Sequence, residues 1–396
     1  MREERSVGMP LEGVRVLDLT RVIAGPLCTQ MLAELGADVV KVENPEGGDE
    51  MRVIGRNKLL RDGVPVEGQT TDFISANRGK RSVTLDLRTA EGQDLVRRLA
   101  ARCDVFVENY KVGDLARYGL DYESLRQLNP GLVYCSITGY GQTGPMARQP
   151  GYDSVFQAMT GMMSLCGEPD GEPQRNAAPL VDHATGQAAL AAILAALWHR
   201  RVNGGPGQHI DIALFDVGVS ALTVRTQEYL VTGASPSRAG NRVKGAAPAR
   251  LVETRDGRMT LSAFREADFR KLCDVLGRPD LSRDPRFETN ALRAANEAEL
   301  DAELNRLFAA ESTAAWVARL QAANIVCAPL YSVGEALECD HAKARGVVCD
   351  MIRPDGQGIR HVATPMRFSE TPIGPAKAPP DLGEHTDEVL REWLGA

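Results

Sequence analysis

The chain has 396 residues, of which 43% are hydrophobic and 25% are charged. This composition is typical of a soluble globular protein and argues against disordered, collagen-like and coiled-coil classes. The 46 Lys and Arg residues against 53 Asp and Glu residues give a net charge of −7, so we expect no general attraction to nucleic acid or to an anionic membrane. An anionic ligand therefore needs a local basic pocket.

The spacing of the cysteines and the lengths of the apolar runs indicate where in the cell the protein is expected to be. The eight cysteines lie far apart without a C-x-x-C pair, and a chain of this length does not need disulfides, so we expect a reducing, cytoplasmic location. The N-terminal segment MREERSVGMPLEG lacks an apolar stretch and is not expected to be a targeting sequence. The longest apolar run, residues 188–198, has 11 residues. It is shorter than the ~20 that cross a bilayer, and it predicts a buried helix.

The first third of the chain alternates strand and helix patterns. Residues 13–43 read as the strand GVRVLDL, the turn TRVIAGP, the helix LCTQMLAELG and the strand ADVVKVE. Short apolar strands flanking a helix indicate a parallel βαβ unit with a right-handed crossover. The pattern recurs with strands at 80–87, 103–109 and 131–141 and helices at 89–102 and 122–128. The fold class is therefore α/β, with a doubly wound parallel sheet in a large domain.

The rest of the chain predicts a second, smaller α+β domain. An alanine-rich helix over 182–201 and the strand HIDIALFD precede a hairpin that turns at Asp256 and Gly257. Helical patterns follow at 264–275, 292–310, 312–323 and 331–346, with the strand NIVCAPL before the last of them. The proline-rich end predicts a strap across another surface. The predicted divisions are a large domain over 1–201, a linker over 202–224, a small domain over 225–330 and a C-terminal strap over 331–396.

Common signatures of hydrolytic and nucleotide-driven chemistry are missing. The sequence has no G-x-x-x-x-G-K-[ST], no G-x-S-x-G and no H-E-x-x-H, which argues against P-loop nucleotide hydrolases, serine hydrolases and zinc proteases. None of the six histidines lies within four residues of another, so a metal site is not expected.

Residues 20–26, TRVIAGP, stand where the first strand ends and the first helix begins. One interpretation is a plain tight turn with Pro26 at the first helical position. The other is a ligand site, because open α/β sheets bind ligands at this edge and backbone amides at a helix start can face phosphate. The residues alone leave both open.

Two aspartates allow a structural and a chemical interpretation. Asp182 in PLVDHATG stands immediately before the alanine-rich helix, so it can be an N-cap. Asp153 in PGYDSVFQAMTG precedes another helix and can be a cap or a first-turn residue. A carboxylate at a helix N-terminus is also stabilised as an anion and can attack an activated acyl group. Spacing does not decide between these interpretations.

Ordered motifs along nearly the whole chain resemble the class III CoA-transferase family. They are PLEGVRVLDLTRVIAGPLCTQMLAELGADVVKVE, ANRGKRSVTLDL, VFVENYKVGDLARYGL, YCSITGYGQTGP, GYDSVFQAMTGMM and VDHATG, followed by RDGRMTLSA and LGEHTDEVL. The similarity is closest to the succinyl-CoA:dicarboxylate branch. The resemblance implies an acyl-CoA:carboxylate CoA-transferase that uses acyl-CoA and a small carboxylic acid as substrates, with no prosthetic group and no metal.

The resemblance also assigns site residues. Asp182 matches the family's nucleophile, which forms an aspartyl anhydride and then an aspartyl-CoA thioester, and Asp153 matches a second active-site carboxylate. The backbone amide of Gly245 is a predicted oxyanion donor. The residues expected to bind CoA are Arg21, Val22, Ile23 and Ala24 near the turn, and Leu85, Arg88, Asn109, Tyr110 and Arg117 at the nucleotide end. The other interpretation of Arg88 and Arg117 is a solvated helix face.

The family resemblance implies an interlocked homodimer, with a heteromer as an alternative. Two other functions stay in view: an α-methylacyl-CoA racemase or epimerase, and a non-catalytic CoA-binding subunit. Racemases of the family have His before the first acidic residue, where this chain has Tyr152. A phenol with an unperturbed pKa of about 10 is a poor base near neutral pH, so transfer is the favoured chemistry.

Overall fold

The computed structural model describes residues 8–374 and 377–395, and its main element is a sheet of six parallel strands. The spatial order is β5-β2-β1-β6-β7-β8. The strands are β1 (Arg15–Leu19), β2 (Asp38–Glu43), β5 (Arg81–Thr84), β6 (Val105–Glu108), β7 (Val133–Thr138) and β8 (His209–Ala213). The predicted α/β class with a parallel sheet is confirmed. Along the chain the strand order reverses between β1 and β6, where ligands bind in folds of this kind.

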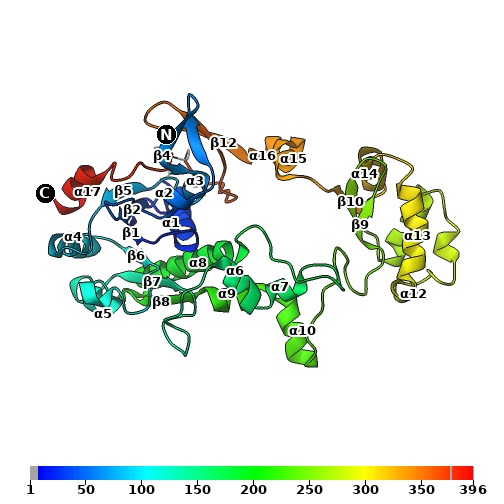
Figure 1. Cartoon of the computed structure of the whole chain (residues 1–396), viewed down its shortest axis with the longest axis horizontal. Coiled ribbons are helices and arrows are strands. Elements are labelled where there is room, and N and C mark those ends of the chain that lie inside the picture. Colours follow the sequence, from blue (N-terminus) through cyan, green and yellow to red (C-terminus); the bar gives the residue numbers. More distant parts are fainter. Residues whose placement is uncertain (1–7, 375–376, 396) are drawn as a thin grey trace, which may run out of the picture. The chain divides into compact units, whose positions relative to one another are not determined.

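Helices cover both faces of this sheet, which explains why its central strands read as continuous Val, Ile and Leu runs. One face packs against α1 (Ala24–Glu34), α6 (Asp153–Met159), α8 (Leu180–Asn203) and α9 (Leu214–Ala221). The other face packs against α4 (Ala90–Ala100), α5 (Tyr122–Leu128) and the C-terminal α17 (Thr386–Leu394) (Figure 1). Two apolar cores therefore hold the ends of β1 and β6 in place.

The alanine-rich helix α8 is long and apolar enough to cross a membrane by length and composition. It packs instead along α1 inside this unit, and Gly186 permits the close approach, since a Cβ there would lie 2.9 Å from the Ala24 carbonyl oxygen. The predicted burial holds for this face only. At the far end of α8 the Trp198 side chain is 67% exposed, so the helix is not enclosed on all sides.

The chain divides into two compact units. The first contains residues up to 162, residues 175–234 and residues from 343 onward, and the second contains 163–174 and 235–342. Residues 202–224, predicted as a linker, contain β8 and α9, and β8 pairs with β7 in the large sheet. The predicted domain boundaries stay predictions.

The second unit contains the predicted hairpin, with β9 (Ala249–Glu253) antiparallel to β10 (Arg258–Ser262) and β11 (Val326–Pro329) on its other side. Its helices are α11 (Glu266–Val275), α12 (Asn290–Ala295), α13 (Glu297–Phe308), α14 (Thr313–Ala322) and α15 (Val333–Glu338) (Figure 1). The predicted helix 292–310 is two helices because Asn296 departs from helical geometry, with φ −107° and ψ 35°. Likewise, Cys339 is extended and separates α15 from α16 (Asp340–Arg345).

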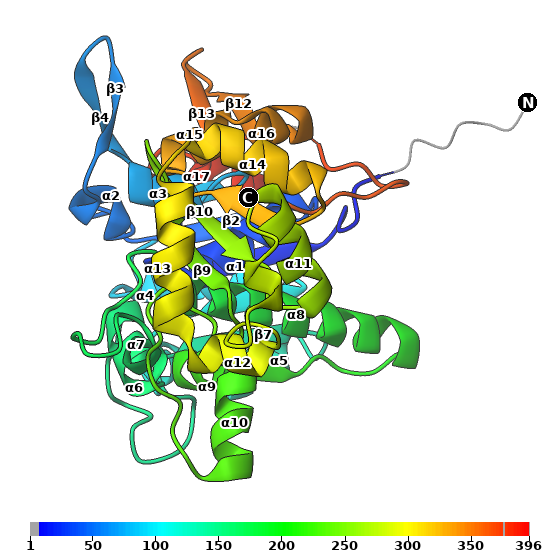
Figure 2. The ribbon, with the colours of Figure 1, turned by 90° about the vertical axis from the view of Figure 1, so that its right-hand side faces the viewer.

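Several elements were not predicted. They are α2 (Met51–Ile54), α3 (Thr71–Ala76), the hairpin β3 (Lys58–Arg61) with β4 (Val64–Thr70), α7 (Met162–Leu165), α9, α10 (Val224–Thr232), the hairpin β12 (Val348–Ile352) with β13 (Gly358–Val362), and 3₁₀ turns at Ala116–Tyr118 and Leu281–Arg283. The predicted strand HIDIALFD ends early, because β8 stops at Ala213 and α9 begins at Leu214. Figure 2 shows the β3–β4 hairpin beside α2. The proline-rich end of the chain leads into α17, which docks on the sheet through Trp393, whose indole N–H donates to Asp38 at 2.9 Å.

Candidate active site

Two pockets open at the carboxyl ends of β1 and β6. The first, called here the Asp182 pocket, is lined by Asp182 together with Arg21, Val22, Ile23, Ala24, Glu50, Asn109, Tyr110, Lys111, Arg148 and neighbouring residues. The second, called here the Arg88 pocket, is lined by residues that include Arg21, Lys41, Asp49, Leu85, Arg88 and Tyr110. Arg21 and Tyr110 line both, so the two pockets are neighbours on the same edge of the sheet.

Asp182 does not cap its helix. The cap residue of α8 is Pro179, whose side chain makes no capping bond, and Asp182 is the third helical residue. The cap comes instead from Asp153, whose Oδ2 accepts the backbone N–H of Val181 at 2.9 Å and that of Asp182 at 3.2 Å. The interpretation of Asp182 as an N-cap is therefore wrong, because a carboxylate from another helix takes that role.

Asp153 is itself held firmly. It is the first residue of α6 and only 8% exposed, and its Oδ1 accepts the side-chain N–H of Gln157 at 2.5 Å. The Gln157 oxygen accepts the Asn176 backbone N–H at 2.8 Å. This chain of bonds ties the segment before α8 to α6, so that the position of Asp182 depends on α6.

The Asp182 carboxylate is buried and lines the pocket. It is 8% exposed, and no side chain or backbone group in residues 8–374 and 377–395 donates a hydrogen bond to it. Burial, and then the negative charge of Asp153, raise its pKa to about 7. Near neutral pH a substantial fraction is ionised, with its oxygen lone pairs unengaged and directed at a pocket, which is the state that a carboxylate nucleophile requires.

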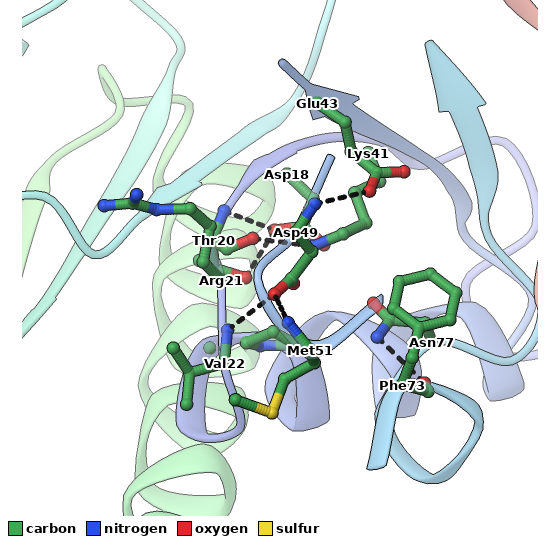
Figure 3. Close-up of polar contacts among 12 residues, drawn as sticks. Asp18, Thr20, Arg21, Val22, Lys41, Glu43, Asp49, Met51, Phe73 and Asn77 are labelled. Carbon is green, nitrogen blue, oxygen red and sulfur yellow. Dashed lines mark hydrogen bonds and ion pairs between the residues drawn. The ribbon is translucent and has the colours of Figure 1, made fainter. Parts of the chain in front are cut away.

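The loop that follows β1 is held in an unusual conformation. Val22 has φ +71°, which is strained for a β-branched residue. Its backbone N–H donates to Asp49 Oδ1 at 3.2 Å (Figure 3). Before it, Asn109 accepts the Arg21 N–H at 3.0 Å and donates to the Arg21 carbonyl oxygen at 2.7 Å. The side chains of Asp49 and Asn109 thus impose the backbone path of this part of the pocket wall.

A buried ion pair lies next to this loop (Figure 3). The Lys41 Nζ lies 2.9 Å from Asp49 Oδ2, both side chains being fully buried, and donates to the Thr20 carbonyl oxygen at 2.6 Å. Burial acts to lower the pKa of Lys41, but the carboxylates of Asp49 and Asp18 outweigh it and raise the pKa. Lys41 therefore stays charged. Removing one partner of such a pair would leave a buried charge uncompensated.

The first turn of α1 presents backbone donors to the same pocket. The cap residue Ile23 makes no side-chain capping bond, and both Ile23 and Ala24 line the Asp182 pocket. Helix starts have unpaired N–H groups and a positive dipole end. Such a turn suits phosphate or an oxyanion, which favours the ligand-site interpretation of residues 20–26 over the plain turn.

The predicted residues fall into three groups. Arg21, Val22, Ile23, Ala24, Asn109 and Tyr110 line the Asp182 pocket together with Asp182, and Leu85 and Arg88 line the Arg88 pocket. Arg88 is exposed and bonds Asp86 at 2.9 Å. Arg117 lines neither pocket, its side chain is 60% exposed, and it lies 3.8 Å from Asp114. This placement fits the solvated-face interpretation of Arg117.

Gly245 lies in the second unit. No described residue accepts its N–H, whereas the N–H of neighbouring Ala246 donates to the Val243 carbonyl oxygen at 3.1 Å. Its assignment as an oxyanion donor stays a prediction.

Several pocket residues were not predicted from the sequence. Asp49 and Lys41 support the loop from behind, and Lys111 and Arg148 add positive charge to the Asp182 pocket. Lys111 follows Tyr110 directly, and Arg148 lies between the GYGQTGP and GYD motifs. A search for basic residues next to the predicted motifs would have found both.

A Rossmann-like sheet with a reactive carboxylate at its switch point defines an α/β enzyme that handles an anionic substrate. A family model described as CoA-transferase family III matches residues 11–386. The chain belongs to this family and is a class III CoA-transferase, an enzyme whose substrates are CoA thioesters.

Individual relatives place the chain further within the family. It is 43% identical over 389 residues to the succinate–glutarate CoA-transferase of Agrobacterium fabrum, covering 97% of this chain and 95% of that protein. It is 39% identical to the succinyl-CoA:glutarate CoA-transferase of Mus musculus, covering 97% and 86%. The crystal structure of a CAIB/BAIF family protein from Brucella suis superposes with a TM-score of 0.89 at 41% identity, covering 98% of this chain and 100% of that one. The predicted family and its dicarboxylate branch are confirmed.

Proposed function

We propose that this enzyme moves CoA from a dicarboxylic acyl-CoA to a free dicarboxylate through covalent intermediates on Asp182. The observation that carries the proposal is the state of Asp182: buried, without a hydrogen-bond partner among the described residues, with a pKa of about 7, and lining a pocket. The two curated relatives described above, whose names contain succinate or succinyl-CoA and glutarate, support the substrate class.

The proposed reaction has four steps. Ionised Asp182 attacks the thioester carbonyl and expels CoA thiolate, which forms an acyl-aspartyl anhydride. The thiolate then attacks the aspartyl carbonyl, releasing the first carboxylate and leaving an aspartyl-CoA thioester. The acceptor carboxylate attacks this thioester, forms a new anhydride and expels the thiolate again. The thiolate finally attacks the new acyl carbonyl, which yields the second acyl-CoA and regenerates Asp182.

The residues around Asp182 serve this sequence in distinct ways. Asp153 is a positioning residue that fixes the first turn of α8 and keeps the pKa of Asp182 high. The unpaired N–H groups at the start of α1 are placed to stabilise negative charge near the thioester. Arg88 and Leu85, in the neighbouring pocket, are proposed to hold the nucleotide end of CoA, and Arg21, which lines both pockets, its central phosphates.

We further propose that the enzyme is a homodimer, interlocked as the family resemblance implies. Large apolar side chains on α10 support it: Leu230 is 73% exposed, Val231 74% and Tyr229 51%, and this helix has no buried residue. Patches of this kind mark interfaces, and a second copy of the chain is the occupant to which we commit. A stable monomer in sedimentation at micromolar concentration would contradict this assembly, as would a requirement for a different second chain.

All eight cysteines are free thiols, which supports the proposed location in a reducing compartment such as the cytoplasm.

The proposed function is tested with a substrate panel. Succinyl-CoA and other acyl-CoA donors are incubated with glutarate, succinate, oxalate, mesaconate and itaconate, and the products are read by mass spectrometry. We expect new dicarboxylic acyl-CoA thioesters without net hydrolysis. Deuterium uptake from labelled water at the α-carbon of a branched acyl-CoA, without transfer to any acceptor, would point instead to an isomerase.

A further inference from the structure

An arginine without a partner lines the Asp182 pocket. Arg148 is exposed, and no acidic side chain or other acceptor in the described part of the chain bonds its guanidinium group. Arg78 and Arg81 of the same unit are paired instead, with Glu34 at 2.9 Å and with Asp38 at 2.6 Å. A cation left unpaired at a substrate pocket is available to neutralise an anionic part of the substrate.

Hydrogen bonds fix the backbone of the loop that carries Arg148, which lies between β7 and α6. At one end the Gln142 N–H donates to Asp211 Oδ2 at 2.9 Å, which ties the loop to β8. Next to Arg148 the Gln149 N–H donates to the Met146 carbonyl oxygen at 2.8 Å and closes a turn. A guanidinium presented from a fixed backbone loses less entropy when it binds a ligand.

Its place in the pocket tells which part of the substrate it meets. Arg21 and Tyr110 line both pockets, whereas Arg148 lines only the one that contains Asp182. The nucleotide end of CoA is assigned to the Arg88 pocket, so Arg148 belongs to the end where the acyl group reacts. The planar guanidinium fork matches a carboxylate in a bidentate manner.

We propose that Arg148 binds the distal carboxylate of a dicarboxylic acyl group while the other end reacts at Asp182, and thereby selects dicarboxylic substrates. The inference rests on the proposed function and adds the residue that decides between a dicarboxylic substrate and a monocarboxylic one of equal length. The same guanidinium chemistry could serve a phosphate of CoA, and the experiment separates these two anions.

The test compares two donors that share the CoA moiety and the four-carbon acyl length: succinyl-CoA, with a distal carboxylate, and butyryl-CoA, with a methyl group. The ratio of their kcat/KM values is measured with one common acceptor for the wild type and for Arg148→Ala. We expect the wild type to prefer succinyl-CoA and the variant to lose about 10- to 100-fold of that preference, the worth of a hydrogen-bonded charge pair. Arg148→Lys should recover part of it.

Two matched variants complete the design. Lys111→Ala removes another exposed cation of the same pocket and should retain the preference for succinyl-CoA. Arg126→Ala removes an exposed arginine on α5 that pairs with Glu123, and it should change kcat/KM for neither donor. If Arg148→Ala lowers kcat/KM equally for both donors, Arg148 contacts a phosphate of CoA and the inference is overturned. It is also overturned if neither kcat/KM value changes, or if the wild type shows no preference between the donors. If the wild type transfers CoA from neither donor to any acceptor, the proposed function itself fails.

Discussion

The Asp182 backbone N–H donates to Asp153 Oδ2 at 3.2 Å, and the charge of Asp153 also raises the pKa of the Asp182 carboxyl. One residue thus positions the proposed nucleophile and keeps part of it protonated at neutral pH. The arrangement separates capping from chemistry, because the residue that reacts is not the residue that stabilises the helix start.

Asp182→Asn therefore tests chemistry with little effect on the fold. The amide lacks an anionic oxygen to form the anhydride, so we expect transfer to fall by several orders of magnitude, while the cap from Asp153 to α8 is retained. In the wild type, hydroxylamine added after acyl-CoA should modify the peptide that contains Asp182. Modification of Asp153 instead, or near-normal transfer by Asp182→Asn, would contradict the assignment.

The same variant should change how stability depends on pH. With its folded pKa raised from 3.8 to about 7, Asp182 binds more protons in the folded than in the unfolded state across that window. The free energy of unfolding therefore falls as pH rises from about 4 to 7 and then levels off. Asp182→Asn removes this slope. The free energy of unfolding of the variant, relative to that of the wild type, should therefore increase by on the order of 3 kcal/mol between pH 5 and pH 8.

Urea unfolding at several pH values measures this difference. Asp94→Asn, at an exposed position on α4, is the matched control and should run parallel to the wild type. Parallel curves for wild type and Asp182→Asn would mean that Asp182 is ionised as readily in the folded as in the unfolded chain.

The pH dependence of transfer should respond to Asp153. Because Asp182 must be ionised to attack, kcat/KM should rise with pH to a plateau, with a midpoint near 7. Asp153→Asn removes the charge that raises the pKa of Asp182, so the midpoint should shift to lower pH. Gln157→Ala keeps the Asp153 charge but removes its 2.5 Å bond; kcat should fall with a smaller shift. Equal midpoints in wild type and Asp153→Asn would argue against electrostatic coupling.

At the nucleotide end of CoA, Arg88 and Arg117 are expected to contribute differently to binding. Arg88 lines the Arg88 pocket and Arg117 lines neither, so Arg88→Ala should raise KM for acyl-CoA several-fold with kcat nearly unchanged, and Arg117→Ala should have a smaller effect. With an acyl-pantetheine donor, which has no nucleotide, the effect of Arg88→Ala should vanish. A larger KM change in Arg117→Ala would reverse this assignment.

Local apolar patterns predicted the strands of the sheet, and the motifs of the family resemblance pointed to Asp182 and to most of the residues that line its pocket. The role of Asp182 stays a prediction. The cap from Asp153 was not predictable in this way, because it joins residues 29 apart in the sequence through the packing of α6 against α8. The β3–β4 hairpin was missed although Asp62 and Gly63, both with positive φ, form its turn; an Asp-Gly pair is a strong hairpin signal. Arg148 is an exposed residue between two motifs, and only its position in the Asp182 pocket indicates a role in binding.

A last prediction concerns Asp49 beside the strained loop. It distinguishes the hydrogen bonds that Asp49 accepts from its negative charge. Asp49 Oδ1 accepts the backbone N–H groups of Val22 and Met51, at 3.2 Å and 3.0 Å, and Asp49 Oδ2 faces Lys41. Asp49→Asn retains an acceptor oxygen for the two N–H groups but loses the charge. Asp49→Ala loses both. Either change removes the carboxylate that lies 2.9 Å from the Lys41 Nζ and should lower stability, by about 3 to 5 kcal/mol.

Binding of acyl-CoA should distinguish the two variants, when both are compared at temperatures where they are folded. Holding Val22 at φ +71° costs on the order of 1–3 kcal/mol, and without the acceptor the loop relaxes. Asp49→Ala should therefore raise KM by about 5- to 20-fold, whereas Asp49→Asn should stay near the wild type. Val22→Gly, combined with Asp49→Ala, should recover part of the loss because Gly adopts positive φ without strain. Equal KM values for Asp49→Ala and Asp49→Asn would show that Asp49 acts through its charge alone.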